Sequence, residues 1–229
     1  MENNKMSKQI SDSSKHTESK QTITYHLLKE ALIHQEFAEG TVLTERKLCS
    51  IFGVSRPPVH HAVQLLIAEG LLRLTKENEM IVPVLSTEDL KEIYEMLEMI
   101  QVSAYTLNRS ILTENLLEMK HCLKKMDDVA RDAQNSPYER FVLDRKFHEQ
   151  ILRNIENERM KECFRKYSDQ YAAYTLLFSK QLWNYDIKNI HEQIYLAVSS
   201  GSQRDVSRAL HAHYADAMRM FKTVKSEST

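Results

Sequence analysis

The chain is poor in residues that interrupt helices, with only 4 glycines and 4 prolines among 229 residues. Because glycine and proline are the least favourable residues inside a helix, we expect long helices with few breaks. Charged residues make up 28% of the chain and hydrophobic ones 42%, a balance typical of a soluble globular protein. The length suffices for one large domain or two small ones.

Features of secreted and membrane proteins are also lacking. The 3 cysteines, Cys49, Cys122 and Cys163, form no C-x-x-C pair, which indicates reduced thiols rather than a disulfide framework. No apolar run approaches the ~20 residues of a membrane span. Residues 1–20 are polar without the apolar core of a signal peptide, so we expect a disordered tail there. A cytoplasmic protein with no membrane partner is predicted.

Residues 44–70 have the pattern of two helices joined by a tight turn. Thr44 is a predicted N-cap, and Gly53 a predicted left-handed C-cap of the first helix. Ser55 is a second predicted N-cap, followed by Pro57 in the first turn, where a missing N–H costs little. This arrangement predicts a helix-turn-helix, which places one helix in the DNA major groove.

The same segment resembles the GntR family of bacterial transcription regulators. The family's E-R-x-L helix, G-V-S-R-x-P-V turn and A-E-G-L ending are matched by Glu45, Arg46, Leu48, Gly53, Val54, Ser55, Arg56, Pro58, Val59, Ala68, Glu69, Gly70 and Leu71. Residues 27–43 resemble the family's first helix and its F-x-x-G turn. The resemblance implies a winged helix-turn-helix over residues 21–84, bound to a double-stranded DNA operator as a homodimer.

The residues that we expect to contact DNA lie in the two helices and in the hairpin that follows them. They are Thr44, Glu45, Arg46, Ser55, Arg56, Pro57, His60, Arg73 and Lys76. Arg56 is the best candidate for a base contact, because a guanidinium can bind guanine through two hydrogen bonds. The family usually has S-R-T-P-V-R-E-A here, but Pro57 replaces the Thr, and His60 and His61 replace the Arg-Glu pair. We therefore expect an operator that differs from the family's usual one.

Positive charge is scarce in the DNA-binding segment. The whole chain has a net charge of −1, and six Lys and Arg residues face seven glutamates between residues 21 and 84. Because DNA affinity depends on neutralising phosphates, we expect these few cations to share one face and a second copy to add its own.

Residues 71–85 change from helical to alternating spacing, which predicts a β-hairpin wing with a polar turn over 76–79. The family commonly has a glycine in this turn, and here Asn78 must supply the tight bend. From Ser86 onward the pattern is wholly helical. Six helices are predicted, one starting at Ser86 or Thr87 and the others over 113–133, 137–154, 156–182, 184–199 and 203–224.

The predicted fold class is therefore mostly α, with an N-terminal winged helix-turn-helix and a C-terminal six-helix antiparallel bundle. The bundle would occupy residues 85–224, and residues 225–229 would form a tail.

One carboxylate and three imidazoles fall on the apolar faces of the predicted bundle. Asp144 and His148 are one helical turn apart, while His191 and His213 lie on two other helices. Buried polar groups need partners, and a divalent metal would satisfy all four, with Zn, Ni, Fe or Mn suited to these ligands. Taken alone, the pair Asp144 and His148 is more simply explained by a hydrogen bond within one helix.

This region resembles the C-terminal ligand-sensing domain of the FadR branch of GntR regulators, and its six helices suggest the VanR-like subgroup. The family's D-x-x-x-H, H-x-x-I-x-x-A-I and A-x-x-x-H patterns are followed by Asp144, His148, His191, Ile194, Ala197, Val198, Ala209 and His213. The resemblance implies a metal bound by the aspartate and the three histidines. It also implies a small carboxylate effector that binds there and shifts DNA affinity.

The chain departs from the family in the first helix of this domain. The family's E-x-R-x-x-L-E run has lost its arginine, which Leu97 replaces. Arg165 and Lys166 are candidates for a substitute cation, and the effector-binding residues are not identified by the sequence.

The leading interpretation is a homodimeric transcription regulator, a repressor and not an enzyme. One alternative is a metal-dependent enzyme using the Asp-His-His-His site, which is weakened by the lack of a general base beside it and of a phosphate-binding glycine loop. The other is a degenerate regulator whose bundle serves mainly for dimerisation.

Overall fold

The computed structural model of the chain describes residues 19–107, 113–131, 137–175 and 187–227. Two compact units join between Val84 and Leu85. Most of the predicted N-terminal tail lies outside the described residues, although Lys20, which we assigned to that tail, already begins a helix. Among the described residues, no helix combines the length and the apolarity needed to cross a membrane.

The first unit is a winged helix-turn-helix, as predicted. Its helices are α2 (Lys20–Ile33), α3 (Glu45–Phe52) and α4 (Arg56–Glu69), and its strands are β1 (Val42–Leu43), β2 (Arg73–Leu74) and β3 (Met80–Ile81). The strands form an antiparallel sheet in the order β1-β3-β2. The sequence did not predict β1, because two residues are too short to show an alternating pattern.

The turn between α3 and α4 follows from its capping residues. The Thr44 hydroxyl accepts a hydrogen bond from the backbone N–H of Lys47 at 3.2 Å, and Gly53 takes a left-handed conformation with φ 66°. Ser55 occupies the N-cap position of α4, but its side chain makes no capping bond. The predicted cap is incomplete because Pro57 and Pro58 hold the positions whose N–H groups an N-cap oxygen binds.

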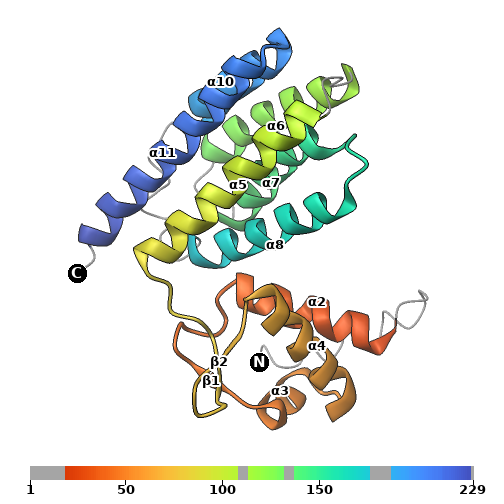
Figure 1. Cartoon of the computed structure of the whole chain (residues 1–229). Helices are drawn as coiled ribbons and strands as arrows, with labels where there is room; N and C mark the ends of the chain where they lie inside the picture. The colour runs from red at the N-terminus through yellow and green to blue at the C-terminus, as the bar shows by residue number, and fades with distance from the viewer. Residues whose placement is uncertain (1–18, 108–112, 132–136, 176–186, 228–229) are drawn as a thin grey trace. The chain divides into compact units, whose positions relative to one another are not determined.

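The core of the first unit lies between α2 and α4, which pack against each other (Figure 1). Leu28, Phe52 and Leu66 are fully buried there. A polar contact joins the same two helices, because Lys29 Nζ lies 2.9 Å from a carboxylate oxygen of Glu69. The glutamate of the family's A-E-G-L ending, Glu69, therefore links the recognition helix to α2.

The second unit is a helical bundle, as predicted. Its described residues form α5 (Thr87–Leu107), α6 (Thr113–Arg131), α7 (Pro137–Leu152), α8 (Glu158–Thr175), α10 (Ile187–Ser200) and α11 (Gln203–Glu227). The predicted helices 156–182 and 184–199 include residues 176–186, which lie outside the described residues. α11 continues to Glu227, so the predicted tail over 225–229 is wrong for its first three residues.

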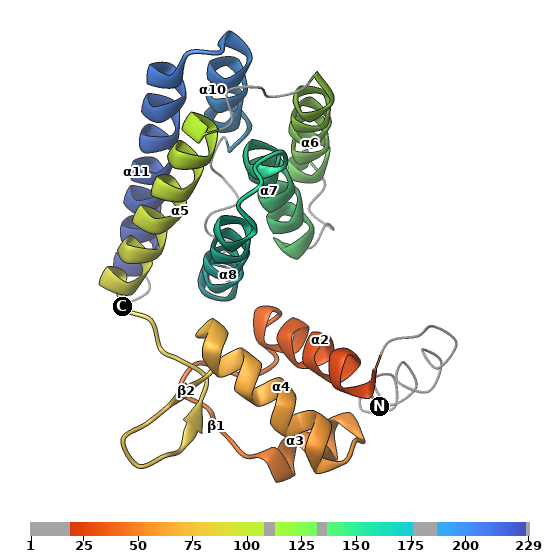
Figure 2. The ribbon, with the colours of Figure 1, turned by 45° about the vertical axis from the view of Figure 1, so that its right-hand side comes forward.

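The helices of the bundle pack through apolar faces with helical spacing. α5 lies along α11 in both views and also packs against α7 and α8, while α6 packs against α7 and α10 (Figures 1 and 2). Phe147, Ile194 and Leu210 are fully buried and bring α7, α10 and α11 into one core. The three predicted histidines lie on these same three helices.

The wing turn gives a first test. Asn78 has a φ of 61°, a left-handed conformation that costs a β-branched residue about 1–2 kcal/mol. We expect Asn78→Val to lower the free energy of unfolding by that amount and Asn78→Gly to leave it unchanged, as measured by urea unfolding. Glu77→Val is the matched control, since Glu77 does not have a positive φ. Equal effects of the two valine substitutions would contradict this explanation.

Candidate functional site

The residues predicted to contact DNA are exposed on the first unit, apart from Glu45. Those at the helix-turn-helix are Thr44, Arg46, Ser55, Arg56, Pro57 and His60, and those at the wing are Arg73 and Lys76. Glu45 is half-buried because two neighbours on α4 cover its carboxylate.

Glu45 links the two helices of the motif. Arg56 Nε donates to Glu45 Oε2 at 2.7 Å, and His60 Nδ1 lies 2.6 Å from Glu45 Oε1. The hydrogen bonds from His60 and Arg56 lower the pKa of Glu45, so its carboxylate is ionised at neutral pH. The Glu45 carboxylate therefore bonds to Arg56 and also to His60, the residue that stands where the family usually has arginine.

The wing presents its cation from a tight turn. The Thr75 hydroxyl accepts hydrogen bonds from the backbone N–H groups of Glu77 and Glu79, each at 3.2 Å. Lys76 lies inside this turn and is exposed. Two of the few cations of the first unit are already in ion pairs. Lys29 is paired with Glu69, and Arg56 is paired with Glu45.

The three predicted histidines of the bundle meet in its core. His148 on α7, His191 on α10 and His213 on α11 each bring a ring nitrogen within 4.8 Å of the others. Their ring centroids are 4.8–5.2 Å apart. His148 and His191 are buried, and His213 is half-buried. By contrast, His211 lies exposed beside Glu98.

Asp144 joins this cluster through His191. Its Oδ1 accepts a hydrogen bond from His191 Nε2 at 2.8 Å and lies 3.9 Å from His148 Nε2, beyond hydrogen-bonding distance. The simpler interpretation of Asp144 and His148, a bond within one helix, is therefore wrong. Burial raises the pKa of Asp144, but the hydrogen bond from His191 and the electrostatic effects of His191, His148 and His213 together outweigh burial and hold the pKa well below its usual range.

One partner of His148 was not predicted from the sequence. Gln101 on α5 is completely buried, and its Oε1 accepts a hydrogen bond from His148 Nδ1 at 2.7 Å. Its amide nitrogen donates to the carbonyl oxygen of Leu97 and to the hydroxyl of Tyr214. Because these bonds orient the amide, His148 carries its proton on Nδ1 and directs an unprotonated Nε2 into the cluster. The signal was a lone glutamine on the apolar face of a predicted helix.

Two nitrogens of the cluster are buried without a partner among the described residues. They are His148 Nε2 and His213 Nδ1. Burial lowers the pKa of His148 to about 4 and that of His213 well below its usual value, so both rings are neutral at neutral pH. Neutral imidazoles with unused lone pairs beside a carboxylate fit a divalent transition metal such as zinc.

A small cavity opens beside the histidines. Its volume is about 20 Å³, enough for roughly one water molecule. Its walls are Tyr94, Leu97, Phe141, Asp144, Arg145, His148, Phe164, Ser168, Tyr171, His213, Tyr214 and Ala217. Arg145 therefore lines this cavity, whereas the predicted substitutes Arg165 and Lys166 do not. Its guanidinium is paired with Asp169 at 2.9 Å.

Comparison with known families decides what these two sites belong to. Residues 20–79 match the family described as "Bacterial regulatory proteins, gntR family", and residues 92–216, more than half of the chain, match the FCD domain. The chain belongs to the GntR family. It is a DNA-binding transcription regulator with an FCD ligand-binding domain.

Two known proteins named as transcription regulators match most of the chain. The uncharacterized HTH-type transcriptional regulator YdhC of Bacillus subtilis (strain 168) is 24% identical over 212 residues, which cover 89% of this chain and 91% of that protein. The gluconate operon transcriptional repressor of Bacillus licheniformis is 23% identical over 199 residues, 82% of this chain and 79% of that protein.

The fold is also found in a solved GntR structure. A GntR protein from Rhodococcus sp. RHA1 superposes with a TM-score of 0.73 at 21% identity, covering 90% of this chain and 99% of that one. This similarity shows that the two chains share a fold.

The Gln101 bonds give a second test. Gln101→Leu removes the partner of His148 Nδ1 and of the Tyr214 hydroxyl, so we expect the free energy of unfolding to fall by about 1–3 kcal/mol. Chemical denaturation followed by circular dichroism measures the change. Met99→Leu introduces the same residue at an exposed position of α5 and should have little effect. If Gln101→Leu leaves the free energy of unfolding unchanged, the hydrogen bonds of the amide do not stabilise the fold.

Proposed function

We propose that this GntR regulator is a homodimeric repressor whose operator affinity changes when a small organic acid binds beside a metal in the bundle. Residues 21–84 bind the operator, and residues 85–224 sense the effector and hold the two copies together. The gluconate operon repressor of Bacillus licheniformis is a relative with a repressor's name, which supports the sign of regulation.

The observation that carries the proposal is the convergence of three histidines from three helices on one buried point. Two of their nitrogens are buried without a partner in the described part of the chain, and a buried polar atom left unpaired costs free energy. His148, His191, His213 and Asp144 would hold a divalent ion, identified by its donor set as Zn, Ni, Fe or Mn. Such an ion offers a Lewis-acidic position to a carboxylate.

The size of the adjacent cavity supports a sensing role. A cavity of about 20 Å³ does not admit an organic acid of several carbons, so the surrounding helices must move apart to bind one. An effector that binds the opened bundle more tightly than the closed one shifts the population between them. Arg145 lines the cavity, and its guanidinium can bind the acid once its ion pair with Asp169 breaks.

DNA recognition is assigned to the exposed residues of the helix-turn-helix and wing. Arg56 reads a base at the start of α4, and Glu45 holds it beside His60 in the free protein. Arg46, Arg73 and Lys76 contact phosphates. Thr44, Ser55 and Pro57 line the same helix ends, where backbone N–H groups and hydroxyls approach the DNA backbone.

Operator binding is the third test. Fluorescence anisotropy should show tight binding to a duplex from the gene's own upstream intergenic region and weaker binding to a scrambled duplex, at two salt concentrations. Arg56→Ala should cost about 1–3 kcal/mol of binding free energy and relax the preference for the specific duplex.

The control for that experiment is Arg204→Ala, which removes an exposed arginine from the second unit. Equal, weak binding of both duplexes by the unmodified protein would argue against sequence-specific recognition. An Arg56→Ala variant that keeps its preference would assign base reading to other residues.

Metal content is the fourth test. The double variant His148→Ala and His213→Ala should lose at least about tenfold in metal affinity, because it removes two of the proposed ligands. Elemental analysis of protein purified without added metal, and the rise in melting temperature on adding Zn²⁺, measure this. His211 is two positions before His213 in the sequence, but its side chain is exposed beside Glu98. The His211→Ala variant should therefore bind metal like the unmodified protein.

Unchanged metal content in the double variant would refute the site. Absence of metal from the unmodified protein, with no response to added Zn²⁺, Ni²⁺, Fe²⁺ or Mn²⁺, would favour a bundle that serves dimerisation alone.

A further inference from the structure

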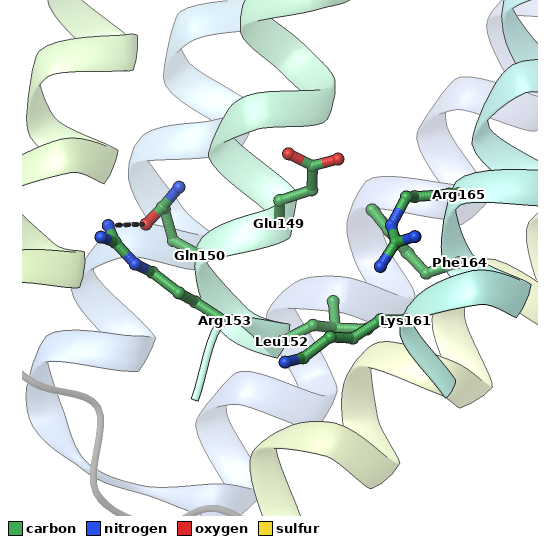
Figure 3. Close-up of a pocket in the computed structure, with 7 residues that line it drawn as sticks. All are labelled: Glu149, Gln150, Leu152, Arg153, Lys161, Phe164 and Arg165. Atoms are coloured by element: carbon green, nitrogen blue, oxygen red, sulfur yellow. Dashed lines mark hydrogen bonds between the residues drawn. The ribbon is translucent and has the colours of Figure 1, made fainter. Parts of the chain in front are cut away.

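A second, larger pocket lies between α7 and α8. Its volume is about 340 Å³, within the range that holds small metabolites, whereas the cavity beside the histidines holds roughly one water molecule. It is lined by Glu149, Gln150, Leu152, Arg153, Lys161, Phe164 and Arg165 (Figure 3). The pocket includes none of the proposed metal ligands, but Phe164 lines both spaces.

Two cations on α8 face the pocket together. Lys161 and Arg165 are one helical turn apart, and Figure 3 shows both extending from α8 toward α7. Both form ion pairs with the exposed Glu158, whose carboxylate oxygens lie 2.8 Å from Lys161 Nζ and 3.9 Å from an Arg165 nitrogen. The Lys161 side chain is only 22% exposed. Such a pair can bind one carboxylate through charge-assisted hydrogen bonds.

A carboxylate lies in the same lining. Glu149 projects from α7, with one oxygen 3.8 Å from Arg145 Nε. Burial raises the pKa of Glu149, and the charges of Arg145 and Arg165 offset this rise only in part. A simple anion on the two α8 cations would be repelled by this group. A molecule that also carries an ammonium would instead gain a partner from it.

The floor of the pocket is apolar. Leu152 and Phe164 are almost fully buried, at 2% and 3% exposure, and belong to the bundle core. We propose that this pocket binds a free amino acid with an apolar side chain, its carboxylate on Lys161 and Arg165 and its ammonium on Glu149. The apolar side chain rests on Leu152 and Phe164. The occupant then contacts the ring that bounds the cavity beside the histidines.

Isothermal titration calorimetry on the full chain tests the class of ligand with three matched probes. L-leucine carries all three features, 4-methylpentanoate is leucine without its ammonium, and glycine lacks the apolar side chain. We expect leucine to bind at least about tenfold more tightly than either of the others, since each loses one set of contacts. Equal or tighter binding of 4-methylpentanoate, or no binding of leucine, would overturn the proposal.

Substitutions locate the bound leucine. The double variant Lys161→Met and Arg165→Met, and separately Glu149→Gln, should each weaken leucine binding about tenfold or more. Lys120→Met, which removes an exposed lysine from α6, should leave it unchanged. If the double variant does not fold, the single variants Lys161→Met and Arg165→Met give the answer.

Variants of the proposed metal ligands distinguish this pocket from the metal site. His148→Ala with His213→Ala should keep leucine binding even where metal is lost. Loss of leucine binding in that variant, or its survival in the α8 variants, would place leucine elsewhere and refute the assignment.

Discussion

The need to satisfy polar rings inside an apolar bundle constrains the second unit. His148 and His191 lie among fully buried apolar side chains such as Phe147 and Ile194, where an unpaired donor is costly. Their partners come from other helices: Gln101 on α5 accepts from one ring, and Asp144 on α7 accepts from the other. These bonds specify how α5, α7 and α10 are positioned relative to one another, which apolar packing alone would specify less strictly.

Two ring nitrogens of the cluster, His148 Nε2 and His213 Nδ1, are left without a hydrogen-bond partner among the described residues, and this supports the proposed metal site. A core built only for stability would be expected to pair or replace them. The space beside them is too small for an organic acid, and the larger pocket between α7 and α8 is bounded by the same phenylalanine. In the proposed mechanism, the helices around the smaller space move apart to admit the ligand.

The first unit shows how a local change in sequence alters a recognition surface without altering the fold. Pro57 and Pro58 remove the donors that a serine cap would use, yet α4 still begins at Arg56 because proline is tolerated in a first turn. His60 replaces an arginine of the family pattern and becomes a second partner of Glu45. The charge presented to DNA thus depends on an acidic side chain as well as on the few cations.

The sequence by itself determined the order of the helices, the helix-turn-helix with its wing, and the family, because these depend on spacing, caps and turn residues that are local in the chain. Gly53 between α3 and α4 adopts the predicted left-handed conformation, and Asn78 supplies the predicted tight bend of the wing with a positive φ. The strand Val42–Leu43 and the last turn of α11 were missed, since neither has a periodic signal of its own.

Only the tertiary structure decided which side chains meet. The spacing of Asp144 and His148 suggested a bond between them, but each bonds instead to a residue more than forty positions away. Gln101 bonds to His148, and Arg145 lines the cavity beside the histidines. Arg165 lines the pocket between α7 and α8 instead. The physical reason is that helical periodicity tells which face a residue occupies, whereas the partner across that face depends on the packing of helices distant in sequence.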